Sequence, residues 1–208
     1  MKSTSDSTMV FRKPKPDSDS PALRVEKLYE YAVKALARLA RSRGEIHALL
    51  RKRKASAADI ETILARLHDN GYLDDARFAR TFVAYRIEND LHGPRRIQQD
   101  LRLKKVDPEI AAQAVADAFV NLDEAKHLRR YLARKVRLSN PITKPSQFAS
   151  LYRRLLRAGF SSATIVRELK NIRHGTSSGN PAETDPPRWE ECLESLAETP
   201  GPDSDIGE

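Results

Sequence analysis

The feature that most constrains this chain is its apolar spacing, which returns every three or four residues from about residue 24 to 173. In the stretch RVEKLYEYAVKALARL, one side of the expected helix carries Val25, Leu28, Tyr29, Ala32, Leu36 and Leu39. No segment alternates between apolar and polar residues for long enough to indicate a strand. The sequence therefore predicts an all-α protein.

The helical pattern itself recurs three times. Three basic helices, within GEIHALLRKRK, GPRRIQQDLRLKK and KPSQFASLYRRLLRAG, are each followed by a turn and a helix led by isoleucine. Taking Ile60, Ile110 and Ile165 as equivalent gives spacings of 50 and 55 residues, from 110 − 60 and 165 − 110. A three-helix unit has a thin core alone, and stacking neighbouring units buries more apolar surface. We therefore expect an elongated, curved stack of three tandem three-helix repeats.

The predicted boundaries follow the joints between these patterns. The three repeats are expected over residues 23–73, 74–121 and 122–173. Residues 1–22 are rich in Ser, Pro and Asp and lack an apolar segment, which indicates a disordered N-terminal arm. Residues 174–208 are rich in Pro, Gly, Ser and acidic residues, which indicates an acidic, largely disordered C-terminal tail.

Charge is distributed unevenly along the chain. The whole chain has 37 Lys+Arg against 29 Asp+Glu, a formal charge of +8. The segment 174–208 has one basic and nine acidic residues, and 1–23 has four and three, which leaves 32 − 17 = +15 for residues 24–173. A body this basic favours a polyanion or an acidic protein surface as partner, although a solvated arginine-rich helical protein has the same composition. The acidic tail could compete with a partner for the basic body.

Several classes of protein are disfavoured. No stretch approaches the ~18 apolar residues of a membrane span, and the start has no apolar segment of a signal peptide. One cysteine, Cys192, allows no internal disulfide, which fits a cytoplasmic location. The five histidines are scattered, and no phosphate-binding loop or nucleophile motif is present. We expect no catalytic residue, no metal and no cofactor, and thus no enzymatic activity.

The joint NGYLDDARFA, residues 70–79, lies between two expected helices. Gly71 suits a left-handed residue that closes the first helix, and Asp74 suits the N-cap of the second. Asp75 then lies in the first turn, where the helix dipole favours negative charge. Leu73 and Phe78 are spaced to pack together as a hydrophobic staple. The two adjacent carboxylates thus have structural roles, so we do not assign them to catalysis or metal binding.

The joint and the segment after it resemble the bacterial RecX family. The matching residues are Gly71, Tyr72, Leu73, Asp74, Asp75, Phe78, Ala79, Arg86, Gly93, Arg96, Ile97 and Leu101. The likeness extends over about residues 28–173, and its central repeat is the specific part. Family members often have Lys-Gly at the end of the second helix of a repeat. This chain has RKRKAS and LKKVD there in the first two repeats, and Gly only in the third.

The resemblance implies a regulator of the recombinase RecA. Such a protein binds the filament that RecA forms on single-stranded DNA and limits filament growth, ATP hydrolysis and strand exchange, in DNA repair and the SOS response. It implies no cofactor and no membrane partner, and we expect a monomer. Tyr72 of the motif is either a half-buried cover over the joint or an exposed aromatic contact for the partner.

The expected partner-binding residues are the cations of the three basic helices: Arg51, Arg53, Arg95, Arg96, Arg102, Lys104, Lys105, Arg153, Arg154 and Arg157. Basic residues in the last turn of a helix also offset its dipole, which is a second explanation for several of them. Arg95 and Arg96 follow Gly93-Pro94, near a helix start where positive charge is unfavourable. We therefore expect an anionic group outside the helix, such as a partner's, to compensate them.

The alternative function is sequence-nonspecific DNA binding without RecA. Three-helix units with a basic helix resemble helix-turn-helix domains. The cations are spread over all three repeats, however, so weak, salt-dependent contact with phosphates is the form of direct DNA binding we expect.

Overall fold

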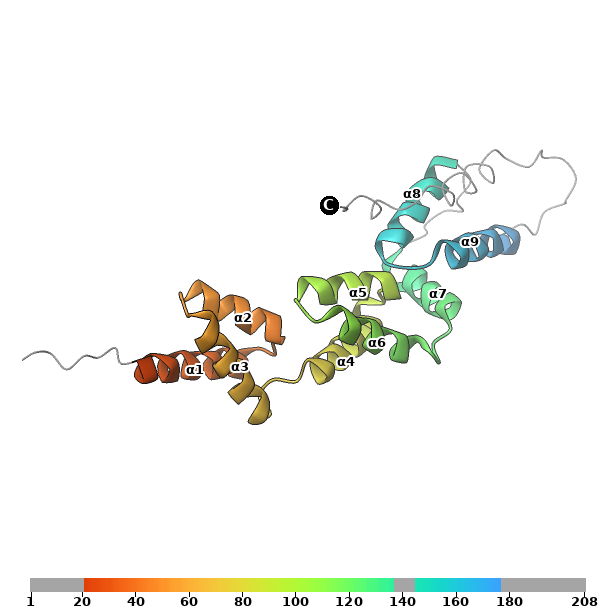
Figure 1. Ribbon diagram of the computed structural model, residues 1–208. Helices are drawn as coiled ribbons and strands as arrows, with labels where there is room; N and C mark the ends of the chain where they lie inside the picture. The colour runs from red at the N-terminus through yellow and green to blue at the C-terminus, as the bar shows by residue number, and fades with distance from the viewer. Residues whose placement is uncertain (1–20, 137–144, 177–208) are drawn as a thin grey trace, which may run out of the picture. The chain divides into compact units, whose positions relative to one another are not determined.

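The computed structural model describes residues 21–136 and 145–176. Every regular element in these two ranges is a helix, and no strand occurs within them, which confirms the all-α prediction (Figure 1). The elements are α1 (Pro21–Arg38), α2 (Arg43–Lys52), α3 (Ala57–Asp69), α4 (Asp75–Tyr85), the π-helix η1 (Arg86–Asp90), α5 (Pro94–Leu103), α6 (Pro108–Phe119), α7 (Glu124–Lys135), α8 (Pro145–Arg157) and α9 (Ser162–Thr176).

The contacts divide the chain into two units. The first contains residues up to 40 and 46–73, and the second contains 41–45 and everything from Asp74 onward. The division at 73 and 74 falls where the second repeat is predicted to begin, whereas the predicted boundary at 121 and 122 lies inside the second unit. The predicted arm 1–22 and tail 174–208 lie outside the described residues, except for 21–22 and 174–176, which are helical.

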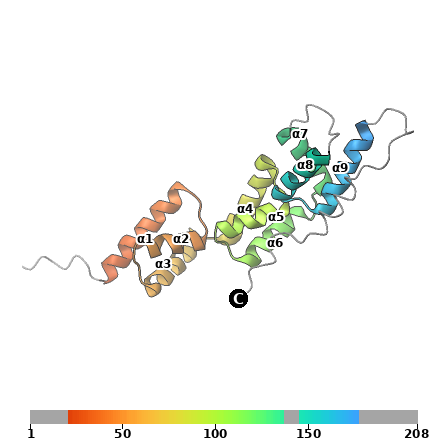
Figure 2. The same cartoon turned by 90° about the horizontal axis from the view of Figure 1, so that it is seen from above.

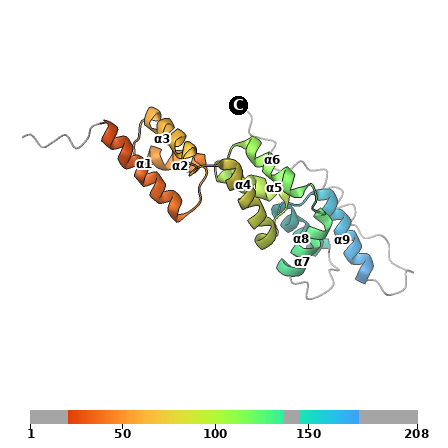
Figure 3. The same ribbon diagram turned by 90° about the horizontal axis from the view of Figure 1, so that it is seen from below.

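Each set of three helices has its own apolar core. Leu50, Ile63 and Leu67 are buried in the core of α1, α2 and α3 (Figure 2). The second unit has two cores, one among α4, α5 and α6 around Ile97 and Leu101, and one among α7, α8 and α9 (Figure 3). The prediction of tandem three-helix repeats is thereby confirmed. The curvature and elongation of the stack stay predictions.

The second helix of every repeat closes with the same turn. In α2, the amide of Ala55 donates to Leu50 O and that of Lys54 to Arg51 O, the two hydrogen bonds of a Schellman motif. The same pair of bonds closes α5 and α8, with Lys105 and Gly159 as the left-handed residues. Lys54 and Lys105 have φ of 60° and 57°. Lysine therefore occupies, in the first two repeats, the position where the resemblance leads one to expect glycine.

The closing turns fix the register of the repeat. Each is followed by a polar N-cap, which is Ser56, Asp107 or Ser161. The residue four places later donates to the cap carbonyl and is buried: Ile60, Ala111 and Ile165. The equivalence drawn from Ile110 is thus wrong by one residue, because Ile110 only borders the core. The corrected spacings are 111 − 60 = 51 and 165 − 111 = 54.

The second unit contains the same joint between helices twice. The amides of Gly93 and Arg95, at the start of α5, donate to Ala158 O (2.8 Å) and Gly159 O (3.2 Å), at the end of α8. A Cβ on Gly93 would overlap the Gly159 backbone, so only glycine allows this approach. Likewise Ser42 Oγ donates to Lys104 O, and a Cβ on Gly44 would overlap Lys105.

The first repeat ends differently. The carbonyl of Lys54, equivalent to those of Lys105 and Gly159, accepts a hydrogen bond of 2.9 Å from the guanidinium of Arg24. Arg24 lies on α1 of the same unit. The closing turn of α2 is therefore satisfied within its own repeat.

The motif joint largely follows the sequence prediction. Gly71 has φ of 72° and closes α3, since its amide donates to His68 O and that of Tyr72 to Leu67 O. Asp74 caps α4 by accepting from the Arg77 amide at 2.8 Å. The expected staple is wrong, because Leu73 packs in the core of the first unit and Phe78 in that of α4, α5 and α6.

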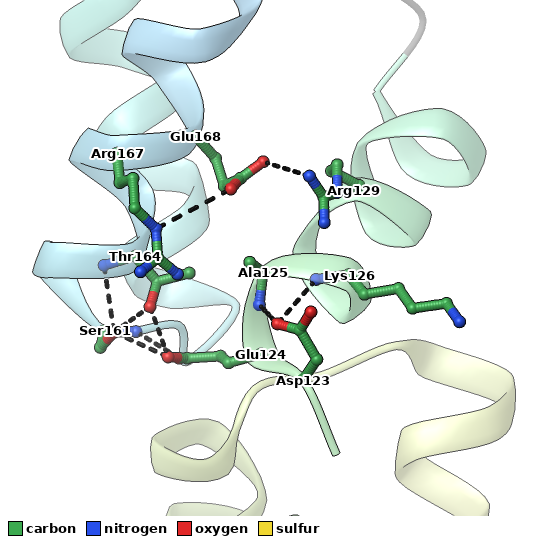
Figure 4. Close-up of polar contacts among 9 residues, drawn as sticks. All are labelled: Asp123, Glu124, Ala125, Lys126, Arg129, Ser161, Thr164, Arg167 and Glu168. Carbon is green, nitrogen blue, oxygen red and sulfur yellow. Dashed lines mark hydrogen bonds and ion pairs between the residues drawn. The ribbon is translucent and has the colours of Figure 1, made fainter.

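A carboxylate ties α7 to the start of α9. Glu124 accepts hydrogen bonds from the Ser161 amide (2.8 Å), the Ser161 hydroxyl (2.8 Å) and the Thr164 hydroxyl (2.7 Å) (Figure 4). Burial alone would raise the pKa of Glu124, but the hydrogen bonds from Thr164 and Ser161 outweigh it and lower that pKa. The ionised form is therefore the one that the fold stabilises.

We expect Lys54→Gly to stabilise the protein by about 0.5–1 kcal/mol, because a left-handed conformation strains a lysine and not a glycine. Lys52→Gly is the matched control. It lies in the last turn of α2, where glycine should destabilise by about 0.5–1 kcal/mol. Urea unfolding of both variants checks the opposite signs, and equal destabilisation would contradict the assignment.

Gly93→Ala should destabilise by about 2 kcal/mol or more, because the new methyl group has no room against the Gly159 backbone. Gly71→Ala is the comparison, since that position has nothing within 4 Å of an added Cβ and only its φ is unfavourable. We expect about 1 kcal/mol there. Thermal unfolding of the two variants measures the difference, and a Gly93→Ala protein as stable as the wild type would contradict the close approach.

The pKa of Glu124 is lower in the folded chain than its ordinary value of 4.5. The folded state therefore gains stability from the ionised group above about pH 4.5, and loses it as the pH falls through the lowered pKa. Glu124→Gln should lose about 1–2 kcal/mol at pH 7 and less at pH 3. Urea unfolding of both proteins at the two pH values tests this, and a pH-independent difference would contradict it.

Candidate partner-binding surface

The ten predicted binding residues lie on different helices. Arg51 and Arg53 belong to the first unit, and the other eight to the second. Arg96 and Lys104 are partly buried, and the other eight side chains are exposed. Their roles can be separated by what each side chain contacts.

In the first unit, Arg53 follows the end of α2 and contacts a side chain of the same repeat. The Arg53 guanidinium lies over the ring of Tyr31, 4.1 Å from its centroid. Arg51 is exposed in the last turn of α2, where a cation also offsets the helix dipole. Arg51 thus supports its own helix, and Arg53 contacts α1 of the same unit.

Helix α5 has an exposed stripe. Arg95, Gln99 and Arg102 are spaced four and three residues apart and are all exposed, whereas Ile97 and Leu101 face the core. Leu103 continues the exposed side and is 72% exposed. The stripe therefore combines two cations with an apolar side chain that the fold leaves in solvent.

Arg96 has a different environment from Arg95. Its Nε lies 3.1 Å from Oδ1 of Asp100, one turn further along α5, and Asp100 is only 6% exposed. Arg86 and His92 also approach this carboxylate, at 3.5 and 3.7 Å. The expectation that a group outside the helix compensates Arg96 is wrong, because Asp100 does so from within.

The same cluster includes Arg86 of the motif, its partner Asp90, and His92. Arg86 NH1 lies 2.5 Å from Asp90 Oδ2 across the π-helix η1. Burial lowers the pKa of His92 and outweighs the nearby Asp90 and Asp100, which act in the opposite direction. His92 is therefore neutral at pH 7, and the buried charge of Asp100 is balanced by the two arginines.

The lysines after α5 are part of the joint with residues 41–45. Lys104 Nζ lies 3.2 Å from Oε1 of Glu45. Glu45 and Ser42 form a capping box at the start of α2, with the Glu45 amide donating to Ser42 Oγ at 3.1 Å. Lys105 is exposed and left-handed. Lys104 thus has a structural partner, and Lys105 presents its side chain to solvent.

On α8, the three arginines also differ. Arg154 donates to the carbonyl of Lys135 at 2.5 Å and so caps the end of α7. Arg153 and Arg157 are exposed. Of the ten predicted residues, Arg95, Arg102, Lys105, Arg153 and Arg157 are exposed cations of the second unit that form no ion pair within the described part of the chain.

Sequence reasoning missed a row of cations on α7. Lys126, Arg129, Arg130 and Arg134 are all exposed. The available signal was the stretch EAKHLRRYLARK, in which the cations alternate with the buried Leu128, Tyr131 and Leu132 at helical spacing. The prediction had considered only the second helix of each repeat, whereas α7 is the first helix of the third repeat.

The motif residues are mainly structural. Ala79, Ile97 and Leu101 are fully buried, and Gly93 makes the close approach described above. Tyr72 is 49% exposed, so about half of its surface is open to a partner. In the described residues, no group of three or more His, Cys, Asp or Glu side chains could hold a metal ion. Over the same ranges, no helix is both long and apolar enough to span a bilayer.

Comparison with known proteins agrees with the motif. A family model described as RecX, second three-helix domain, matches residues 74–115. Regulatory protein RecX of Mycobacterium sp. (strain KMS) is 32% identical over 157 residues, covering 73% of this chain and 84% of the relative. RecX of Cronobacter sakazakii is 34% identical over 119 residues, covering 57% and 70%.

Two solved structures share the fold. The crystal structure of RecX from Lactobacillus salivarius has a TM-score of 0.63 at 21% identity and covers 73% of this chain and 97% of that one. A crystal structure of a regulatory protein RecX has a TM-score of 0.60 at 22% identity, covering 72% and 73%. With a relative at 32% identity over most of its own length, the chain belongs to the RecX family of regulatory proteins.

Proposed function

We propose that this protein modulates, mainly by inhibition, the recombinase RecA. It binds the filament that RecA forms on single-stranded DNA and limits filament growth, ATP hydrolysis and strand exchange, in DNA repair and the SOS response. Membership of the RecX family is the observation that carries this proposal. The protein modulates RecA in the cytoplasm, where the filament forms, and each copy acts as a monomer without a cofactor.

The docking surface in this proposal is the exposed stripe of α5: Arg95, Gln99, Arg102 and Leu103. Protein interfaces combine an apolar or aromatic contact with polar and charged residues at the rim. Leu103 supplies the apolar contact, and the two arginines supply donors for the carboxylates of an acidic surface. Lys105, one turn beyond, extends the positive charge.

A stack of repeats suits a repeating partner. Each repeat presents a short helix of similar length, so a stack offers a series of contacts rather than a single pocket. Binding to more than one RecA subunit would interfere with subunit addition and with the rearrangements that accompany ATP turnover. The elongated, curved arrangement predicted from the sequence belongs to this proposal.

The alternative is nonspecific DNA binding without RecA. The basic body supports it, because phosphate contacts need only positive charge. Adding RecA and ATP distinguishes the two functions. A filament-binding protein should gain apparent affinity for single-stranded DNA sharply, whereas a protein that binds DNA alone should gain none or be displaced.

The test of the docking surface is the double variant Arg95→Glu/Arg102→Glu. We expect the concentration needed to inhibit the ATPase of RecA on single-stranded DNA to rise by about tenfold or more, because two favourable charge contacts become repulsive. The matched control is Lys34→Glu/Arg38→Glu, which reverses the same charge at exposed positions of α1 outside the ten predicted residues and should inhibit within a few-fold of the wild type.

Circular dichroism shows whether both variants are folded. Arg96 is left intact because removing it would expose the charge of Asp100 inside the fold. A folded α5 variant that inhibits like the wild type would remove this stripe from the docking surface. A wild-type protein that leaves RecA turnover unchanged would contradict the function itself.

A further inference from the structure

Helix α7 presents a row of like charges to solvent. Lys126, Arg130 and Arg134 follow one another at four-residue steps, and Arg129 lies beside them. Four residues of helix advance by about 6 Å and turn by about 40° more than one full turn, so the three side chains form a slightly slanted row of cations along one side of the helix. We call Lys126, Arg129, Arg130 and Arg134 the α7 ridge.

The ridge is unfavourable for the isolated helix. Like charges four residues apart repel each other, and Lys126 lies in the first turn, where the helix dipole disfavours a cation. Arg129 is compensated by the buried Glu168, at 3.4 Å (Figure 4). Within the described part of the chain, no acidic side chain pairs with Lys126, Arg130 or Arg134. An anionic ligand would remove this repulsion.

The opposite face of α7 holds the ridge in place. Leu128, Tyr131 and Leu132 are buried in the core of the third repeat. Glu124 anchors the start of the helix to α9, and Arg154 caps its end at Lys135. The cations therefore project from a fixed helix, which reduces the entropy lost when a ligand binds.

The composition of the face indicates the class of ligand. Among the exposed residues of α7, the largest apolar side chain is that of Ala133. A protein interface needs an apolar or aromatic anchor, which α5 offers in Leu103 and α7 does not. A hydrated phosphate backbone needs only a series of cations, which the ridge supplies at ~6 Å steps along α7.

We propose that the α7 ridge binds the sugar–phosphate backbone of nucleic acid directly, at a site separate from the α5 stripe. The ridge has no exposed aromatic side chain on which a base could stack, and no group placed to read base edges. Binding is therefore indifferent to sequence, weak and strongly dependent on salt. This inference does not require RecA.

The experiment uses the full-length chain and a fluorescent single-stranded DNA of mixed sequence, with anisotropy measured from 25 to 200 mM salt. The test variant is Lys126→Gln/Arg130→Gln/Arg134→Gln, which preserves helix-forming side chains. Arg129 is kept, because removing it would leave the buried carboxylate of Glu168 unpaired. The control is Lys34→Gln/Arg38→Gln/Arg80→Gln, which removes the same charge from α1 and α4.

We expect the α7 variant to bind roughly 10- to 100-fold more weakly at low salt, with a salt slope shallower by about 2, as the loss of three phosphate contacts requires. The control should remain within a few-fold of the wild type. Equal weakening of both variants would mean that net charge alone attracts DNA, and would overturn the site. So would a wild-type protein that does not bind DNA at low salt.

A RecA ATPase assay separates this inference from the proposed function. If the α7 variant keeps its DNA affinity but loses inhibition, the ridge contacts the recombinase and the inference is wrong. If the DNA affinity of the α7 variant falls as expected while neither the wild type nor the variant affects RecA, nucleic-acid binding by the ridge is supported and the proposed function is contradicted.

Discussion

The closing turn of the second helix is the constraint on which the second unit depends. At Gly93 the chain approaches the turn after α8 so closely that no side chain fits, and the amides of α5 donate to the last carbonyls of α8. Residues 41–45 approach the turn after α5 in the same way, through Ser42 and Gly44. At the first of these joints, free amides at the start of α5 and free carbonyls at the end of α8 satisfy each other, and at the second the Ser42 hydroxyl satisfies the Lys104 carbonyl.

Local rules predicted local structure well. Gly71 and Asp74 end one helix and begin the next as expected, because left-handed residues and caps depend on a few neighbouring atoms. The register at Ile110 was wrong because two adjacent apolar residues compete for one buried position, and only packing selects the smaller Ala111. The binding residues were least predictable. An exposed cation and one that balances a buried carboxylate, such as Arg96, look alike until the fold places their partners.

The exposed cations of α5 and α7 lie in two different chemical environments. On α5 they flank Leu103, a mixture suited to a protein surface, and on α7 they stand without any apolar neighbour larger than alanine. Arg96, Arg86 and Arg154 meanwhile balance or cap groups of the fold itself. The positive charges of this chain therefore differ in what they are available to bind. In the function proposed above, the nucleoprotein filament would present protein to the first environment and phosphate to the second.

The hydrogen bond from Arg24 to the Lys54 carbonyl distinguishes the first repeat from the other two. In the other repeats the corresponding carbonyl faces backbone from the preceding segment, at Gly44 or Arg95. The guanidinium of Arg24 on α1 takes that place in the first repeat, so the Lys54 carbonyl has a partner within its own unit. The closing turn of the first repeat is therefore completed by a side chain of its own unit.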